Sequence, residues 1–597
     1  MKVTYELAAL MGFLLAGMGT GTCDLQAQVP YDQAYGEEAM DLSEQVILFT
    51  DRNMYAVSES IWFRSFYRIN EMPVEEALSR VLYVELVTPS GESVARAKYP
   101  HHSNGSAGYL DIPSDAISGN YFLRSYTRWM RNFGPRSYSY VPLTIINPYR
   151  RDILKGGNGP REGYRGSFRP GNAVQCRADK SIYLPGETVR IELSLPEGPG
   201  FYAGEYCLTV VPAGLADTVC DQICSGEEGF HPPFSFDYLP EIRGVSVSGS
   251  VVMAGNQLPL QTTPQTTPQT PSPSPNTRVH FSMLGEEPEY FGALTDEMGR
   301  FMVTLPDRTG TRELFVAAES SVLGPSAGGP SVQAGHSIRI DQDFTTDPLP
   351  FSIAPFELSA AQRESATRMV MNMQLSVAFQ SEPAESRKEE KKAKVPFYGI
   401  PVLTIHMEEY VSLPTMTEVF ENLIPLVYVK YRKGEPSLKI ESQNTMISHY
   451  PPLILLDRIP VFDHQAVLSV DPSKILKIEV INEVYVRGSL LYGGVIVLTS
   501  KAGDMASIDL PEGSYFFDYR VYHQPGRYEP EPGTGRTPDS RNTLVWMDSI
   551  RLDQQEKEIL QFPASSRQGE YLILVRGVSP RNEIVFGTDR FEVARGR

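Results

Sequence analysis

The pattern of apolar and polar positions between residues 451 and 501 predicts a compact group of short strands. The run Leu453–Leu456 is continuously apolar and ends at Asp457-Arg458, which predicts a strand buried on both faces and closed by a turn. The segment Leu476–Val480 alternates apolar and charged residues, with the period of a half-buried strand. A second buried strand is predicted at Val495–Thr499, after two glycines at which the chain can bend.

Helix-start patterns accompany these strands. Asp471-Pro472 is typical of an N-cap followed by proline at the first helical position. Thr415 and Glu418 have the spacing of a capping box, and the helix that they begin carries one apolar face, made of Met416, Val419, Phe420 and Leu423. Together these elements predict a small α+β domain at residues 405–503.

The remaining chain has the alternation and turn spacing of β-sandwiches. Strands such as Val81–Val87 and Gly119–Thr127 predict a sandwich at 43–148, and a glycine-rich linker, 156–171, leads to a short or partial second one at 172–213. Further sandwiches are predicted at 239–320 and, with strand cores at Tyr571–Val575 and Phe591–Val593, at 508–595. The proline- and threonine-rich loop 259–277 cannot bury a core, so we expect it to be extended and disordered.

An internal repeat links the first two sandwiches. Asp51, Tyr55 and Glu59 recur without gaps, at an offset of 128 residues, as Asp179, Tyr183 and Glu187. Each copy is a turn-rich entry into an alternating strand, so the repeat predicts two related domains.

These segments resemble known families. Both copies of the repeat resemble the "D+..Y.PGE.V.F" signature of macroglobulin-like domains, and 239–301 resembles the carboxypeptidase-regulatory sandwich with its "D..G.F" turn. Residues 452–501 resemble the plug domain of TonB-dependent receptors, although Arg458 stands where that family has glycine. The predicted fold class is therefore mainly β: tandem macroglobulin- or Ig-like β-sandwiches plus one small α+β plug-like domain.

Only 96 residues follow Lys501, whereas a plugged barrel needs about 22 strands of roughly ten residues. We therefore expect no barrel from this chain, and a plug-like domain that docks to another protein.

Residues 1–27 resemble a cleaved secretory signal, with Leu25-Gln26-Ala27 before the cut and lipidation at Cys23 as the alternative. We expect no transmembrane segment in the mature chain and a place in the periplasm or at the outer membrane.

The net charge of −18 argues against nucleic acid as a partner. Export permits disulfides among Cys176, Cys207, Cys220 and Cys224; Cys176 could face Cys207, and Cys220 could close a loop with Cys224.

Catalytic patterns are weak. Ser326 lies in a G-x-S-x-G motif, but the surrounding glycines and prolines block the strand-to-helix elbow that this motif needs. His101-His102 is the one histidine pair, no zinc pattern occurs, and the macroglobulin thioester "CGEQ" is missing. We predict no catalytic, cofactor-binding or metal-binding residues.

The predicted function is a non-enzymatic cell-envelope binding or scaffold protein that is associated with TonB-dependent transport machinery and has protein partners in the outer membrane or periplasm. The alternatives are a cryptic hydrolase that uses Ser326 and a macroglobulin-type protease-binding protein without thioester. Deletion of 405–503 is expected to leave the sandwiches folded and to abolish binding of outer-membrane proteins.

Overall fold

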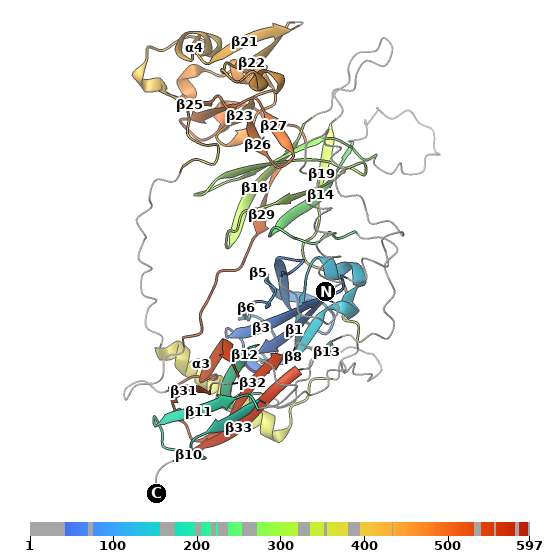
Figure 1. Ribbon diagram of the computed structural model, residues 1–597, viewed down its shortest axis with the longest axis vertical. Coiled ribbons are helices and arrows are strands. Elements are labelled where there is room, and N and C mark those ends of the chain that lie inside the picture. Colours follow the sequence, from blue (N-terminus) through green and yellow to red (C-terminus); the bar gives the residue numbers. More distant parts are fainter. Residues whose placement is uncertain are drawn as a thin grey trace, which may run out of the picture.

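The computed structural model is mainly β and consists of tandem sandwiches and one α+β module, which confirms the predicted fold class (Figure 1). It describes residues 42–69, 76–155, 174–196, 204–216, 223–224, 237–253, 272–319, 335–351, 355–379, 395–432, 434–529, 539–554, 557–579 and 584–594. The predicted signal, the linker 156–171 and most of the loop 259–277 lie outside these residues. Among the described residues, no helix is long and apolar enough to cross a membrane.

The N-terminal sandwich is formed by two sheets. The first has the order β1 (Glu44–Thr50), β3 (Ser60–Ile69), β6 (Ala107–Asp111). The second has the order β13 (Ile223–Cys224), β8 (Ser139–Ile146), β7 (Gly119–Tyr126), β4 (Val81–Val87), β5 (Ser93–Pro100), and β2 (Met54–Ala56) pairs with β8 in parallel.

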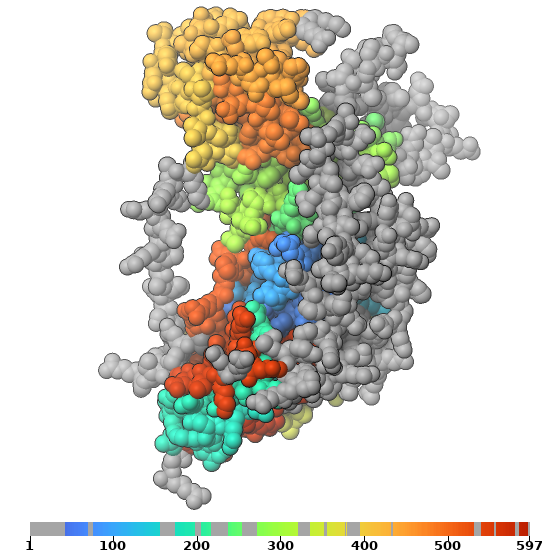
Figure 2. All heavy atoms as spheres, viewed as in Figure 1, coloured from blue at the N-terminus to red at the C-terminus, as the bar shows by residue number. Residues whose placement is uncertain are grey.

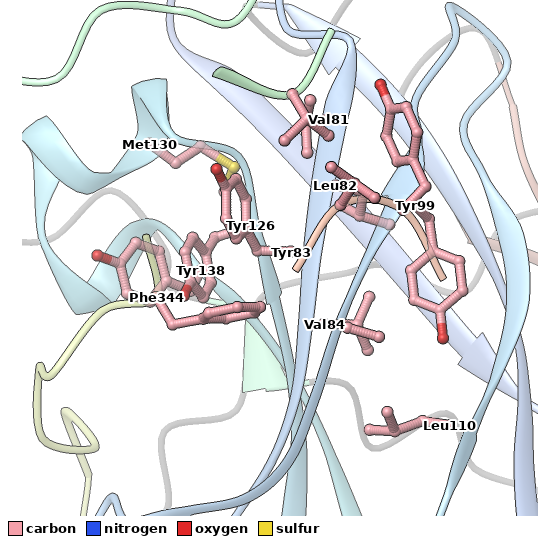
Figure 3. Close-up of a cluster of buried hydrophobic side chains, with 14 of the residues drawn as sticks. Val81, Leu82, Tyr83, Val84, Tyr99, Leu110, Tyr126, Met130, Tyr138 and Phe344 are labelled. Carbon is pink, nitrogen blue, oxygen red and sulfur yellow. The ribbon is translucent and has the colours of Figure 1, made fainter. Parts of the chain in front are cut away.

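All seven residues of β4 are buried, because both faces of this strand are covered. Tyr83, Tyr126, Tyr138 and Phe344 lie together beside the strand, apart from Val84 and Leu110 (Figure 3). The rings of Tyr83 and Tyr126 stack with centroids 5.5 Å apart, and Phe344 meets Tyr83 edge-on at 5.3 Å. Phe344 comes from the segment that follows the strand His336–Ile340 of the middle sandwich, so this sheet is covered by chain from outside its own domain.

The middle sandwich combines strands that lie far apart in the sequence. One sheet has the order β17 (Arg300–Thr304), β14 (Ser246–Met253), β19 (His336–Ile340). The other has the order β16 (Glu289–Leu294), β15 (Arg278–Met283), β18 (Thr311–Ala318), β29 (Tyr515–Arg520). The last strand, β29, follows the α+β module and pairs antiparallel with β18, Leu314 opposite Phe517.

The second sandwich corrects the prediction of a separate C-terminal domain at 508–595. Its sheets have the orders β10 (Ile182–Tyr183), β33 (Ile584–Val593), β32 (Gly569–Val578), β12 (Gly204–Pro212), β30 (Val545–Leu552) and β31 (Glu558–Pro563), β11 (Thr188–Ser194), β9 (Gln175–Ala178). The strands of 172–213 are thus too few to bury a core alone, and those after 539 complete them. Sequence alternation identified the strands and could not show which distant strands pair.

The α+β module, residues 395–508, contains one sheet with the order β20 (Leu403–His406), β25 (Ile475–Ile481), β28 (Val495–Ser500), β23 (Leu453–Leu456), β24 (Ile459–Pro460). The hairpins β21 (Val427–Arg432)–β22 (Glu435–Ile440) and β26 (Tyr485–Arg487)–β27 (Leu490–Tyr492) and the helices α4 (Met416–Leu423) and α5 (His464–Leu468) complete it. The predicted strands at 453–456 and 495–499 are confirmed, as are the caps at Thr415 and Asp471.

The prediction for Leu476 was wrong. We expected its side chain on the buried face of the strand, but it is 37% exposed and Ile475 is buried instead. The register between β25 and β28 shifts between Ile475 and Lys477, so one extra residue in β25 turns Leu476 outward.

The three units past the N-terminal sandwich are nested. The α+β module is inserted between β19 and β29 of the middle sandwich, and the middle sandwich lies between β12 and β30 of the second sandwich. The helix α3 (Ala360–Phe379), which the sequence analysis did not identify, packs on β2 of the N-terminal sandwich through Ala366, Met369 and Met373. In Figure 1 the units follow one another along the long axis, with the α+β module at one end.

Candidate binding site

The strand β20 lies at an edge of the sheet in the α+β module. It pairs on one side with β25, Leu403 opposite Val480 and His406 opposite Lys477, and no described strand pairs with its other side. Leu403 and Ile405 face the core of the module, whereas Thr404 and His406 are exposed. In an antiparallel edge strand, alternate backbone N–H and C=O groups point away from the single neighbour, so β20 offers them to an added strand.

This edge lacks the protection that the other sheet edges have. Proteins block pairing at an edge with charged residues, proline or very short strands. Among the described edge strands with at least four residues, every other one contains Asp, Glu, Lys or Arg; β5 has Arg96 and Lys98, and β30 has Asp548 and Arg551. The sequence of β20, Leu-Thr-Ile-His, contains none of these and no proline.

Exposed apolar side chains are concentrated on the same module. Of the 21 large apolar residues that are exposed in the described chain, 11 lie in it. In the segment before β20 the exposed fractions are 78% for Ile400 and 56% for Val402, and Val411, which follows the turn Met407–Glu409, is 86% exposed. The others are Val395, Tyr410, Tyr428, Tyr431, Met446, Leu476, Val486 and Leu491. Because scattered single residues are normal but a concentration is not, this module carries the candidate binding surface.

A different face of the module is fixed to the middle sandwich. Phe315 and Ala317 of β18 are completely buried among the core residues of the module. Tyr290 of β16 packs with Leu453, Tyr492 and their neighbours in a second shared cluster. Figure 2 shows the module and the middle sandwich as adjoining masses at that end of the molecule. The orientation of the module is therefore set by burial, not only by its two chain connections.

A buried hydrogen-bonded chain crosses this contact. His280 Nδ1 lies 2.6 Å from the Tyr290 hydroxyl, and that hydroxyl lies 2.6 Å from the Tyr492 hydroxyl. Burial lowers the pKa of His280 and raises the pKa of Tyr290 well above its ordinary value. Both groups are therefore neutral near pH 7, and the other ring nitrogen of His280, Nε2, lies 3.5 Å from the Glu319 carboxylate.

A polar pocket of about 250 Å³ lies where the N-terminal sandwich, α3 and residues 540–543 meet. Its charged side chains are satisfied by one another: Arg52 pairs with Asp51 and with Glu59 at 3.0 Å, and Arg541 pairs with Asp539 at 2.8 Å. Thr543 donates to Asp51 and Asn542 donates to Glu59. No charged group of this pocket is left to bind a ligand, so we assign it to the docking of the 539–543 segment.

The first copy of the internal repeat supplies the residues that hold the 539–543 segment. In both copies the tyrosine hydroxyl donates to the aspartate, at 2.7 Å for Tyr55 and 2.5 Å for Tyr183, and the glutamate accepts a backbone N–H, from Ala56 or Leu184. The motif shapes the turn before the strand. In the first copy Asp51 Oδ2 and Glu59 Oε1, which also pair with Arg52, accept from Thr543 and Asn542 and so hold the 539–543 segment. In the second copy Tyr183 is buried but Asp179 is exposed.

The residues considered in the sequence analysis form no catalytic or metal site in the described chain. Ser326, Cys220 and the side chain of Cys224 lie outside the described residues. Cys176 and Cys207 are both free, which corrects the suggested pairing: they lie in different sheets, Cys176 at the core of the second sandwich and Cys207 at its contact with the N-terminal sandwich. Burial raises the pKa of Cys176 to about 12.

His101 is buried beside Ser106, and burial lowers its pKa to about 3, while His102 is exposed. No described group of His, Cys, Asp and Glu residues could hold a metal ion.

The sequence pattern predicts the α+β module but does not identify its edge strand β20. The boundary set at 405 cut through β20, although Leu403 and Ile405 alternate with Thr404 and His406. Four residues are too short a pattern to identify alone. The exposure of Ile400 and Val402 depends on which strand ends the sheet, and periodicity does not give sheet order.

No family model and no curated protein matches the chain. Solved structures similar to it include Salmonella alpha-2-macroglobulin reacted with methylamine, at 11% identity and TM-score 0.23, and Escherichia coli alpha-2-macroglobulin activated by porcine elastase, at 10% and 0.23. The matches cover 93% of this chain but only 40% and 44% of those chains. Murine CEACAM1b is similar over 46% of the chain, at 9% identity and TM-score 0.10. Similarities this low support no statement about function.

Proposed function

We propose that this chain is a non-enzymatic binding or scaffold protein of the cell envelope, and that its α+β module docks another protein. The observation that carries the proposal is the unprotected edge of β20 within the largest concentration of exposed apolar side chains. Burying such residues against a partner removes apolar surface from water, and the open edge supplies backbone hydrogen bonds to the same contact.

The identity of the partner rests on the resemblance of 452–501 to the plug of TonB-dependent receptors. By that analogy the partner is a component of the outer-membrane transport machinery, and the chain acts in the periplasm or at the outer membrane. The non-enzymatic character is supported by the polar pocket, in which every charged side chain is paired within the protein.

Photo-crosslinking of the full chain tests this proposal. A photoreactive phenylalanine analogue is placed singly at exposed positions of the module, Val411, Tyr431 and Val486, and of the sandwiches, Tyr149, Ile182 and Ile559. After irradiation with a solubilised outer-membrane fraction, we expect adducts with outer-membrane proteins from the module positions. Adducts from the sandwich positions alone would contradict docking through the module, and adducts with a protease there would favour the macroglobulin-type alternative.

A further inference from the structure

We propose that β20 is the docking edge itself and that its occupant is an extended segment of a different protein, with alternating apolar and polar residues and a Lys or Arg at the end next to Glu408 and Glu409. This inference rests on the proposed docking function of the module and names the site and the chemistry of the partner.

The alternation follows from the two faces of β20. Leu403 and Ile405 contact the core of the module, and Thr404 and His406 face solvent. Side chains of a strand added at this edge lie beside those of β20 on the same faces. Residues beside Leu403 and Ile405 continue the inner face over the core of the module, so they are apolar, whereas those beside Thr404 and His406 lie on the outer face, which Val402 shares, and face water.

The Lys or Arg at one end of the added segment is inferred from the negative charge of the turn directly after β20. Glu408 and Glu409 form the short helical turn η5 (Met407–Glu409) directly after β20, are exposed, and form no ion pair with a described residue. A Lys or Arg at that end of the added strand would pair with them, and this pairing would fix the register and direction of the segment.

The same charges disfavour a second copy of this chain. If two β20 strands paired antiparallel about a twofold axis between Thr404 and Ile405, Glu408 and Glu409 would lie opposite Pro401 and Ile400 of the other copy. No basic residue lies there, so both pairs of carboxylates would stay without a counter-charge. A segment of a different protein with a Lys or Arg at this end would supply both the backbone hydrogen bonds for β20 and the counter-charge for Glu408 and Glu409.

The test uses the full chain with the photoreactive residue at Tyr431, which lies outside β20, and the solubilised outer-membrane fraction as probe. The double variant Val402→Lys/Thr404→Lys places charges along the edge, in the way that natural edges are protected. Ile182→Lys is the matched control, because Ile182 is exposed to the same 56% as Val402 and lies in β10 of the second sandwich, outside the candidate binding surface. The charge reversal Glu408→Lys/Glu409→Lys tests the basic end of the segment.

We expect the edge variant to lower the yield of the adduct at least tenfold, the charge reversal to lower it about fivefold and less so at high salt, and Ile182→Lys to leave it unchanged. All altered side chains are exposed, so circular dichroism and melting temperature are expected to match those of the wild type. Wild-type yield from the edge variant would overturn the inference while leaving the docking function standing. An adduct with a second copy of this chain would also overturn it. Absence of adducts from all module positions of the wild type would contradict the docking function itself.

Discussion

Asp457 and Arg458 form the two-residue turn between β23 and β24, and both have positive φ, 49° and 74°. Glycine is the residue that this second position favours, because a side chain in the left-handed region costs about 1 kcal/mol. The Asp457 carboxylate holds the turn by accepting from the Ser500 N–H and hydroxyl and from the Met505 N–H. The Arg458 side chain is exposed and makes one long bond, 3.3 Å, to the carbonyl of Gly285.

We therefore expect Arg458→Gly to raise the free energy of unfolding of the module by about 0.5–1 kcal/mol. Scanning calorimetry of the full chain measures it as an upward shift of the transition that includes the module. Arg458→Ala is the control, since it removes the same side-chain bond and keeps the unfavourable φ. If both variants melted at the same temperature, backbone strain would not be the reason.

His280 makes the contact between module and middle sandwich sensitive to acid. Its pKa in the folded chain is below the ordinary 6.5, so the unfolded chain takes up the proton first as pH falls. The stability that His280 contributes is complete above pH 6.5 and decreases as pH falls below it toward the lowered pKa.

We expect the difference in unfolding free energy between wild type and His280→Gln to be smaller at pH 5 than at pH 7.5. The measurement is urea unfolding, monitored by far-ultraviolet circular dichroism. The comparison with the variant is needed because His101, His336, His464 and His523 also have lowered pKa values. An equal difference at both pH values would show that His280 takes no part in the acid response.

At the level of single elements, α3 holds the N-terminal sandwich through one face only. Met369 is 1% exposed and packs on Met54 and Ala56, whereas Met371 is 53% exposed on the same helix. We expect Met369→Ala to destabilise this contact by about 2 kcal/mol, because it leaves a cavity, and Met371→Ala to change stability by less than about 0.5 kcal/mol. Limited proteolysis within 360–379 measures the difference. Equal cleavage rates for the two variants would mean that α3 is not held by this face.

Sequence patterns predicted elements well where the cause is local. The caps at Thr415 and Asp471 and the buried run Leu453–Leu456 depend on neighbouring residues, and they were confirmed. Leu476 was misplaced because a bulge arises from pairing with β28, and α3 was missed although Ala366, Met369 and Met373 have helical spacing. The edge position of β20 depends on the order of the whole sheet, so the candidate site could be placed on a module but not on a strand.

At the scale of the whole molecule, the insertion of one unit within another decides which parts can be removed. Deletion of 405–503 was expected to leave the sandwiches folded. Phe315 and Ala317 are completely buried by the module, so the deletion exposes an apolar face of the middle sandwich.

The second sandwich depends in the same way on its last strands. We expect a chain truncated at residue 538 to lose the structure of 174–216, because β11 and β12 lose the neighbours β30, β31 and β32. Hydrogen exchange measured by mass spectrometry is expected to show peptides from 174–216 exchanging at rates close to those of an unfolded chain. Peptides from β4 and β7 serve as the internal control, since both neighbours of each strand are retained. Full protection of 174–216 in the truncated chain would contradict the shared sandwich.

The pairing of β12 with β30 and β32 also sets an order of assembly. Roughly 330 residues separate β12 from β30, and at 5–20 residues per second a ribosome needs about 20–60 seconds to make them. During that time the pair β9–β11 and the strand β12 are parts of two incomplete sheets with open edges, while the enclosed units can already fold. The outermost sandwich is thus the last to close although its first strands are made early, and it forms only when synthesis has passed β33.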